Sequence, residues 1–145
     1  MRVNIYIESG IKGLKRRSGV VGFILEAEGY EGKTVTQFGF VKEATENQAQ
    51  LLALKYALKR IRDMSELRIW TDNSYMAAAF EQDWISGWIE RDWKTAKGKE
   101  VANREEWESI LQMLGESVPE FQVAQSHSFK SWLSKEIERR AEKYV

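Results

Sequence analysis

The sequence predicts an α/β protein in which helices pack on a mixed β-sheet. Up to Val41 the chain carries three segments with strand character, rich in β-branched and aromatic residues. Residues 45–62 then place apolar side chains three and four positions apart, and residues 66–71 have strand character again. Three strands joined by short connections, followed by a crossover helix and a further strand, favour a mixed sheet with helices packed on it.

The first strand is predicted at Val3–Glu8, where apolar and polar residues alternate and the last residue is an acid. Two more strands are predicted at residues 19–27 and 33–41. The Gly29-Tyr30-Glu31-Gly32 segment between them indicates a hairpin. The connection after the first strand is a basic loop without acidic residues, and it contains Lys12, Lys15, Arg16 and Arg17.

A helix is predicted from Thr45, a suitable N-cap, to about Arg62. The strand at residues 66–71 follows and stops at Asp72-Asn73-Ser74, residue types that favour turns and helix N-caps. Asp72 has two interpretations. Taken alone, its residue type favours a helix cap, but ligands of open α/β sheets bind beyond the carboxyl ends of strands, where Asp72 is also suited to metal or phosphate chemistry.

The second half of the chain is predicted to be mainly helical. Helices are expected at about residues 73–81 and 103–114, and a charged one at about 130–144, with a short strand at 120–124 after Pro119. A further helix is expected between the first two, where Trp84, Trp88 and Trp93 are four and five residues apart, and a loop with several lysines follows. Helical spacing places Trp84 and Trp88 on one face.

Composition narrows the class of protein. The chain has 145 residues, of which 43% are hydrophobic, so one domain over residues 1–145 with a full core is expected. It has no cysteine, which excludes disulfides and thiolate metal sites. The 22 basic residues balance the 22 acidic ones, so basic surface is confined to local patches. The early charges and the lack of a long apolar run lead us to expect a cytoplasmic, membrane-free protein, and we expect it to be a monomer.

Two segments resemble ribonuclease H of the bacterial type I family. Trp-Thr-Asp-Asn-Ser-Tyr (70–75) is similar to that family's Thr-Asp-Ser-x-Tyr, and residues 84–102 are similar to its Trp-Ile-x-x-Trp, Gly-Trp-Lys-Thr and lysine-rich loop. Weaker similarity covers residues 45–51 and the last helix. The resemblance implies a ribonuclease H-like fold with a five-stranded mixed sheet. It also implies metal-dependent hydrolysis of the RNA strand of RNA–DNA hybrids with two Mg²⁺ ions held by four carboxylates, which bridge the scissile phosphate.

Carried over by position, the four metal-binding and catalytic places fall at Glu8, Gln50, Asp72 and Glu138. Only Asp72 keeps the family's residue. Glu8 and Glu138 are one methylene longer than aspartate, which puts the geometry of a Mg²⁺ site in doubt. Gln50 keeps a carbonyl ligand but lacks a negative charge. Glu136 is an alternative to Glu138, and both also fit a solvated helix face. Mn²⁺ is an alternative cation because its coordination is less exacting.

The resemblance also implies roles for residues outside the metal site. His127 occupies a loop where the family often has a catalytic histidine, although a lone loop histidine is more often simply exposed. Asn47 and Gln48 correspond to the segment that contacts the minor groove and the 2′-hydroxyl. The remaining predicted nucleic-acid contacts come from the tryptophan-lined protrusion, and they are Trp88, Trp93, Lys94, Thr95, Lys97 and Lys99. Tryptophans at helical spacing are also typical of a core, and we expect Trp84 and Trp107 to be buried at the base of the protrusion.

Three hypotheses follow, and each makes a different prediction. The first is a ribonuclease H-type endonuclease that is weakened by its altered metal ligands. The second is a catalytically inactive nucleic-acid-binding module on the same fold. The third is an interaction protein that keeps only the fold. Hybrid binding without cleavage would select the second hypothesis, and the lack of any affinity for a hybrid would select the third.

Overall fold

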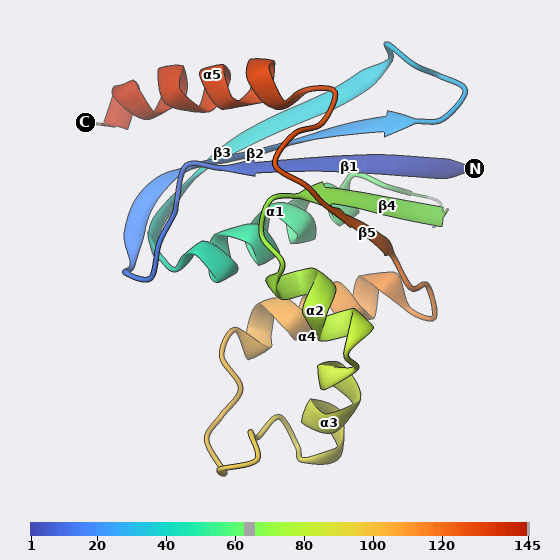
Figure 1. The fold of residues 1–145 in the computed structure, drawn as a ribbon, viewed down its shortest axis with the longest axis vertical. Helices are drawn as coiled ribbons and strands as arrows, with labels where there is room; N and C mark the ends of the chain where they lie inside the picture. The colour runs from blue at the N-terminus through green and yellow to red at the C-terminus, as the bar shows by residue number, and fades with distance from the viewer. Residues whose placement is uncertain (63–65, 145) are drawn as a thin grey trace.

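The fold is a five-stranded sheet between two helical layers, with a small helical lobe extending beyond one of them (Figure 1). A computed structural model describes residues 1–62 and 66–144. The order of strands across the sheet is β3-β2-β1-β4-β5. The strands are β1 (Arg2–Ser9), β2 (Arg17–Ala27), β3 (Thr34–Ala44), β4 (Glu66–Thr71) and β5 (Glu120–Val123).

The sheet is mixed, as the sequence predicts. β1, β2 and β3 pair antiparallel, whereas β4 pairs parallel with both β1 and β5. In the parallel pair, Tyr6 of β1 lies opposite Trp70 of β4. The residues just beyond this pair, Glu8 and Asp72, therefore emerge at the same edge of the sheet.

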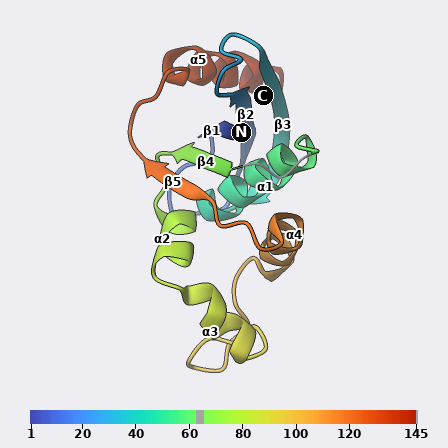
Figure 2. The same cartoon turned by 90° about the vertical axis from the view of Figure 1, so that its right-hand side faces the viewer.

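Helices cover both faces of the sheet. α5 (Lys130–Ala141) lies on one face, against β1 and β2, and is followed by a short 3₁₀ turn (Glu142–Tyr144). α1 (Glu46–Lys59) lies on the other face and packs against α4 (Arg104–Leu114). α2 (Tyr75–Glu81) leads to α3 (Trp84–Glu90), which lies farthest from the sheet in both views (Figures 1 and 2). We call residues 83–103, from the start of α3 to α4, the lobe.

The alternation of side chains along β1 builds a core on each side of the sheet. Ile5 and Ile7 face the larger core, which α1, α2 and α4 complete, whereas Tyr6 faces a smaller core with Leu133 and Ile137 of α5. The register of α5 follows from this smaller core, because Leu133 and Ile137 are four residues apart and form its buried face.

The predicted element order is confirmed, and the differences lie at element ends. α1 ends at Lys59 rather than near Arg62, and α5 gives way to the 3₁₀ turn after Ala141. Thr45 caps α1 as predicted, accepting a hydrogen bond from the Gln48 backbone N–H at 3.1 Å. Of the predicted domain 1–145, residues 63–65 and 145 lie outside the described part. In the described part, the helices are too short or too polar to cross a membrane.

Candidate functional site

Two carboxylates mark the candidate site at the carboxyl edge of β1 and β4. Glu8 is buried near the end of β1, and Asp72 directly follows β4 and is partly buried. Asp72 is not the N-cap of α2, because that position is Ser74. The interpretation of Asp72 as a simple helix cap is therefore wrong, and its carboxylate is free to take part in a site with Glu8.

Gln50 belongs to α1, which lies on the face of the sheet opposite to α5, and it approaches the same edge from that face. It is completely buried, and its Oε1 accepts a hydrogen bond of 2.7 Å from the Thr71 hydroxyl. The Thr71 hydroxyl also accepts the Asn73 backbone N–H at 3.1 Å. Within the described residues, the Gln50 Nε2 has no hydrogen-bond partner. The carbonyl oxygen that could serve as a ligand is thus already used to hold the turn that carries Asp72.

Two lysines close a ring of ion pairs with the two carboxylates. The Lys130 ammonium donates to both oxygens of Glu8, at 2.8 and 2.7 Å, and lies 3.5 Å from Asp72 Oδ2. The Lys12 ammonium donates to the same Asp72 oxygen at 2.7 Å and lies 4.0 Å from Glu8 Oε1. We call these four residues the ion-pair ring. Positive and negative groups alternate around it, so each carboxylate faces both ammonium groups.

The ion pairs favour the charged forms of Asp72 and Lys130 in spite of burial. Burial opposes ionisation of Asp72, but the nearby Lys12 and Lys130 outweigh it and hold the pKa of Asp72 below its ordinary value. Burial likewise opposes the charge on Lys130, but its hydrogen bonds and attraction to Glu8 raise its pKa. Asp72 and Lys130 therefore stay charged through the neutral pH range.

This set of residues does not fit two divalent cations. The ring carries two negative and two positive charges, and Gln50 adds a neutral amide. Among residues 1–62 and 66–144, no group of three or more histidine, cysteine, aspartate or glutamate side chains is placed to hold a metal ion. Two Mg²⁺ ions need several hard, negatively charged oxygen ligands. The four-residue metal set predicted from the resemblance is therefore not assembled.

Glu138 is the predicted ligand that fails to reach the site, and the register of α5 explains why. Ile137 is buried against the sheet, and a Cβ added at Gly10 would lie 3.2 Å from its Cγ2. Glu138 is one residue farther along, about 100° around the helix, and is exposed. The alternative, Glu136, pairs with Arg139 at 2.8 Å and with Arg140 at 3.6 Å on its own helix. The solvated-face interpretation holds for both.

His127 lies beside the ion-pair ring, and a hydrogen bond within its own loop holds its side chain. Its Nδ1 accepts the Phe129 backbone N–H at 3.1 Å, and its ring centroid is 5.0 Å from that of Tyr6. Burial, assisted by the positive charge of Lys130, lowers the pKa of His127 to about 4. The side chain is therefore neutral at pH 7, with its proton on Nε2, so it can donate but cannot act there as a charged acid.

Asn47 and Gln48 lie at the start of α1, beside the turn that carries Asp72. The Asn73 side-chain amide donates to Asn47 Oδ1 at 3.1 Å. The Gln48 Oε1 accepts from Arg16 at 3.2 Å, while its Nε2 donates to Glu106 at 2.9 Å. A surface hollow here is lined by Gly13, Leu14, Arg16, Thr45, Glu46, Asn47, Asn73, Tyr75, Ala102 and Asn103. The hollow extends from residues next to the ion-pair ring, Gly13 and Asn73, to Ala102 and Asn103, where the lobe joins α4.

The tryptophans of the lobe mainly build it. Trp107 is fully buried, as expected, and Trp88 packs against it and against Trp93, with ring centroids 5.6 and 6.0 Å apart. Trp93 is only 7% exposed, so the prediction that it contacts nucleic acid is wrong: its ring is needed to fill the lobe. Trp84, expected to be buried, is 38% exposed, because α3 buries only Ile85 fully.

The predicted lysine contacts occupy a small turn at the end of the lobe. Lys94, Lys97 and Lys99 are exposed. Thr95 holds the turn together, because its backbone N–H donates to the Lys99 carbonyl at 2.7 Å and its hydroxyl accepts the Lys99 N–H at 3.2 Å. The lysines thus project from a fixed turn, and the Thr95 hydroxyl accepts one hydrogen bond within that turn while its O–H can still donate.

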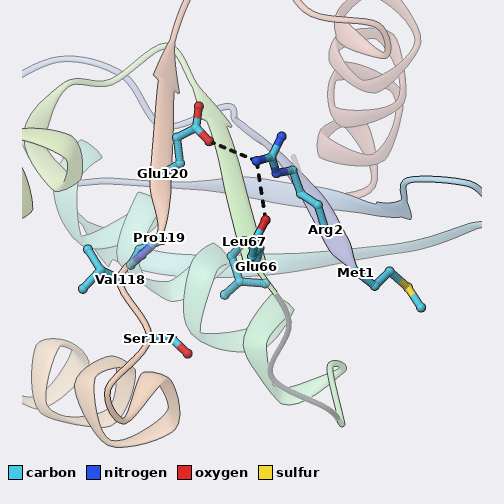
Figure 3. A pocket seen from close by; sticks show the side chains of 8 residues that line it. All are labelled: Met1, Arg2, Glu66, Leu67, Ser117, Val118, Pro119 and Glu120. Atoms are coloured by element: carbon cyan, nitrogen blue, oxygen red, sulfur yellow. Dashed lines mark hydrogen bonds and ion pairs between the residues drawn. The ribbon is translucent and has the colours of Figure 1, made fainter.

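A second hollow lies at the opposite ends of the strands (Figure 3). Arg2 and Glu66, at the beginnings of β1 and β4, pair at 3.5 Å, and Arg2 lies 4.0 Å from Glu120 at the beginning of β5. Arg2 is therefore shared between two acidic side chains, Glu66 and Glu120. It contains none of the residues predicted to act in catalysis or nucleic-acid binding.

Comparison with known proteins identifies the family of this chain. The family model described as RNase H matches residues 2–131, nearly the whole chain. This chain belongs to the ribonuclease H family. A ribonuclease H of Acetivibrio thermocellus is 33% identical over 109 residues, covering 75% of this chain and 71% of that protein. A ribonuclease H of Nitratidesulfovibrio vulgaris is 36% identical over 84 residues, covering 58% of this chain but only 54% of the relative. The matched part thus spans about half of that relative.

Solved structures support the same ribonuclease H-like fold. LC9-RNase H1, described as a type 1 RNase H with the type 2 active-site motif, superposes with a TM-score of 0.73 at 18% identity and covers 99% of this chain and 74% of its own. The foamy viral protease-reverse transcriptase, solved in complex with an RNA/DNA hybrid, gives a TM-score of 0.64 at 14% identity, over 98% of this chain and 19% of its own.

Sequence reasoning identifies both carboxylates of the ring but misses both lysines. In the sequence, Lys12 is only one residue of a basic loop, and Lys130 only begins the last helix. Lys130 is 122 residues from Glu8 in the chain, so local patterns cannot pair them. One signal in the sequence could have revealed the lysines. Two carboxylates with too few neighbouring acids to hold a metal ion need positively charged side chains as partners, and lysines near both expected strand ends can supply them.

Proposed function

We propose that this chain binds RNA–DNA hybrids on a ribonuclease H fold and does not cut them by the two-metal route. The single observation that carries this proposal is the ion-pair ring. Both oxygens of Glu8 and the Oδ2 of Asp72 are bonded to lysine, and Gln50 contributes no charge. Members of the ribonuclease H family act on RNA–DNA hybrids, which supports the hybrid as ligand.

The surface around the ring supports binding of a duplex. The hollow lined by Arg16, Asn47 and Asn73 lies between the ring and the lobe. Amide side chains can donate to and accept from a 2′-hydroxyl, the group that distinguishes RNA from DNA. The exposed Lys94, Lys97 and Lys99 supply positive charge for the other strand's phosphates. The proposed contacts therefore extend from the ring to the lobe.

Hydrolysis of the RNA strand, with Mg²⁺ or Mn²⁺, is the second candidate function. One observation favours it besides family membership. Asp72 Oδ1 is buried and, within the described part of the chain, has no hydrogen-bond partner. An ionised oxygen in this state is costly unless something binds it, and a cation is one such ligand.

One experiment separates the two candidates. A labelled RNA–DNA hybrid is incubated with the protein in Mg²⁺ and separately in Mn²⁺, and binding is followed by fluorescence anisotropy and cleavage by gel electrophoresis. The proposal predicts a saturable complex and intact RNA with both metals. Cleavage by the wild type that disappears in Asp72→Asn would establish hydrolysis instead. No binding under any condition would leave an interaction protein that keeps only the fold.

A further inference from the structure

The ion-pair ring has a composition that a metal site normally excludes. A carboxylate pair that binds divalent cations presents its oxygens to the cation, with the positive charge supplied from solution. Here both positive charges belong to the chain. Lys12 comes from the loop after β1 and Lys130 from the first turn of α5, so two separate segments converge on one carboxylate pair.

The two ammonium groups and the two carboxylates are arranged so that each carboxylate bridges both positive charges. All four N–O distances around the ring lie between 2.7 and 4.0 Å. The carboxylates form the floor, with 6% of the Glu8 side chain and 13% of the Asp72 side chain exposed. The lysines lie over them, with 46% exposure for Lys12 and 27% for Lys130. An anion that approaches from solvent meets ammonium groups first.

A divalent cation would have to displace at least one ammonium group. Because the ring is neutral, adding a cation without displacing a lysine would leave an excess of two positive charges in a partly buried site. Such an excess is strongly unfavourable where the dielectric constant is low. Displacement of Lys130 would in turn break two short hydrogen bonds to Glu8. Metal binding is therefore opposed both by charge and by the need to break these hydrogen bonds.

We propose that Lys12 and Lys130 stand in for divalent cations, so that the charges of the two carboxylates are balanced without metal and the site offers ammonium groups to a backbone phosphate. Lys12 is the better placed for that contact. Its ammonium has three donors and makes one hydrogen bond, to Asp72, in the described structure. The ligand in this inference, a phosphate of the hybrid, rests on the proposed function, whereas the exclusion of metal does not.

Exclusion of metal is tested without nucleic acid. Mn²⁺ binding is measured by isothermal titration calorimetry for the wild type and for Lys12→Met/Lys130→Met. A matched control, Lys15→Met/Lys135→Met, removes two exposed lysines from the same loop and the same helix. The wild type and the control are expected to show no saturable site, and the ring variant is expected to gain one. A wild-type Mn²⁺ site that Asp72→Asn abolishes would overturn the proposal.

The ring variant leaves two buried carboxylates unpaired and is at risk of unfolding, so its thermal denaturation is measured with EDTA and with Mn²⁺. Recovery of the folded state, or a rise of roughly 5 °C in its midpoint, on adding Mn²⁺ supports the proposal. A wild-type midpoint that rises as much on adding Mn²⁺ would overturn it.

The single variant Lys12→Met tests the phosphate contact, because Asp72 keeps Lys130 as a partner. Hybrid affinity is measured in EDTA. A wild-type affinity that is independent of metal and falls about tenfold or more in Lys12→Met supports the proposal, since the variant lacks a charged hydrogen bond to the phosphate. An unchanged affinity in the variant would overturn the phosphate contact. If the wild type binds no hybrid at all, the proposed function fails, but the Mn²⁺ titration still decides whether the lysines replace metal.

Discussion

Gln50 shows how one residue changes the character of the site. It is a neutral amide in a fully buried position, and its carbonyl oxygen holds the Thr71 hydroxyl. A carboxylate at the same position would add a third negative charge to a place where the two existing ones are already matched by lysines. The sequence reveals the missing charge, but only the structure shows that the protein has built a neutral site around it.

Gln50→Glu is therefore expected to destabilise the protein by about 2 kcal/mol, because it buries an unpaired charge. Urea denaturation in EDTA measures the change. Gln122→Glu makes the same chemical change at an exposed position of β5 and is expected to alter stability by less than about 0.5 kcal/mol. If Gln50→Glu proves as stable as the wild type, the site tolerates more negative charge than the ring implies.

His127 gives a second prediction at the scale of the residue. Its pKa of about 4 lies below the ordinary value, because burial and Lys130 disfavour its charged form. We expect its imidazole ¹H NMR signals to stay constant from pH 8 to about pH 5 and to titrate below that.

The same shift has a consequence for stability. Below about pH 6.5 the unfolded chain takes up a proton that the folded chain does not, so stability should fall as the pH falls from about 6.5 towards 4. Titration of His127 near pH 6.5 in the folded protein would show that its side chain is solvated rather than buried beside Lys130.

At the scale of the element, the buried face of α5 decides which side chains reach the site. Leu133 and Ile137 fix the helix on the sheet, which directs Lys130 to Glu8 and leaves Glu138 in solvent. The helix itself is predictable from the sequence. The rotation of the helix about its axis is not predictable, because the charged segment offers few apolar positions. The resemblance to a family motif favours Glu138 over the alternative, Glu136.

The lobe combines a packed aromatic interior with exposed lysines. Trp88 packs against both Trp107 and Trp93, and three exposed lysines project from the turn at residues 94–100. The helices of this region can be predicted from apolar spacing, but the burial of Trp93 cannot. It is the tertiary contact with Trp88, rather than a helical position, that covers its ring.

Replacing the three lysines together, as Lys94→Gln/Lys97→Gln/Lys99→Gln, should weaken hybrid binding and its dependence on salt. The slope of log affinity against log salt concentration should decrease by about 1 for each lysine–phosphate pair that the variant no longer forms. Fluorescence anisotropy at several salt concentrations measures this slope. The control Lys33→Gln/Lys42→Gln/Lys59→Gln changes three exposed lysines of the β2–β3 turn, β3 and the end of α1. An equal effect in both variants would mean that the lobe does not bind the hybrid specifically.

At the scale of the whole molecule, the fold is predictable from the sequence and the chemistry is not. Alternation in β1, the hairpin at Gly29–Gly32 and the Leu spacing of α1 depend on local periodicity, which determines element type and order. The ring instead depends on contacts between residues up to 122 positions apart. A ribonuclease H fold is thus retained around a centre in which two lysines are paired with two carboxylates.

The most direct test of this account is the affinity of the wild-type protein for an RNA–DNA hybrid in EDTA and in Mg²⁺, with the integrity of the RNA checked in the same samples. Equal affinity in both conditions and uncut RNA are expected, because Lys12 and Lys130 supply the positive charge at the site. Binding that requires Mg²⁺, or RNA cleavage that Asp72→Asn abolishes, would contradict it and restore the metal-dependent nuclease.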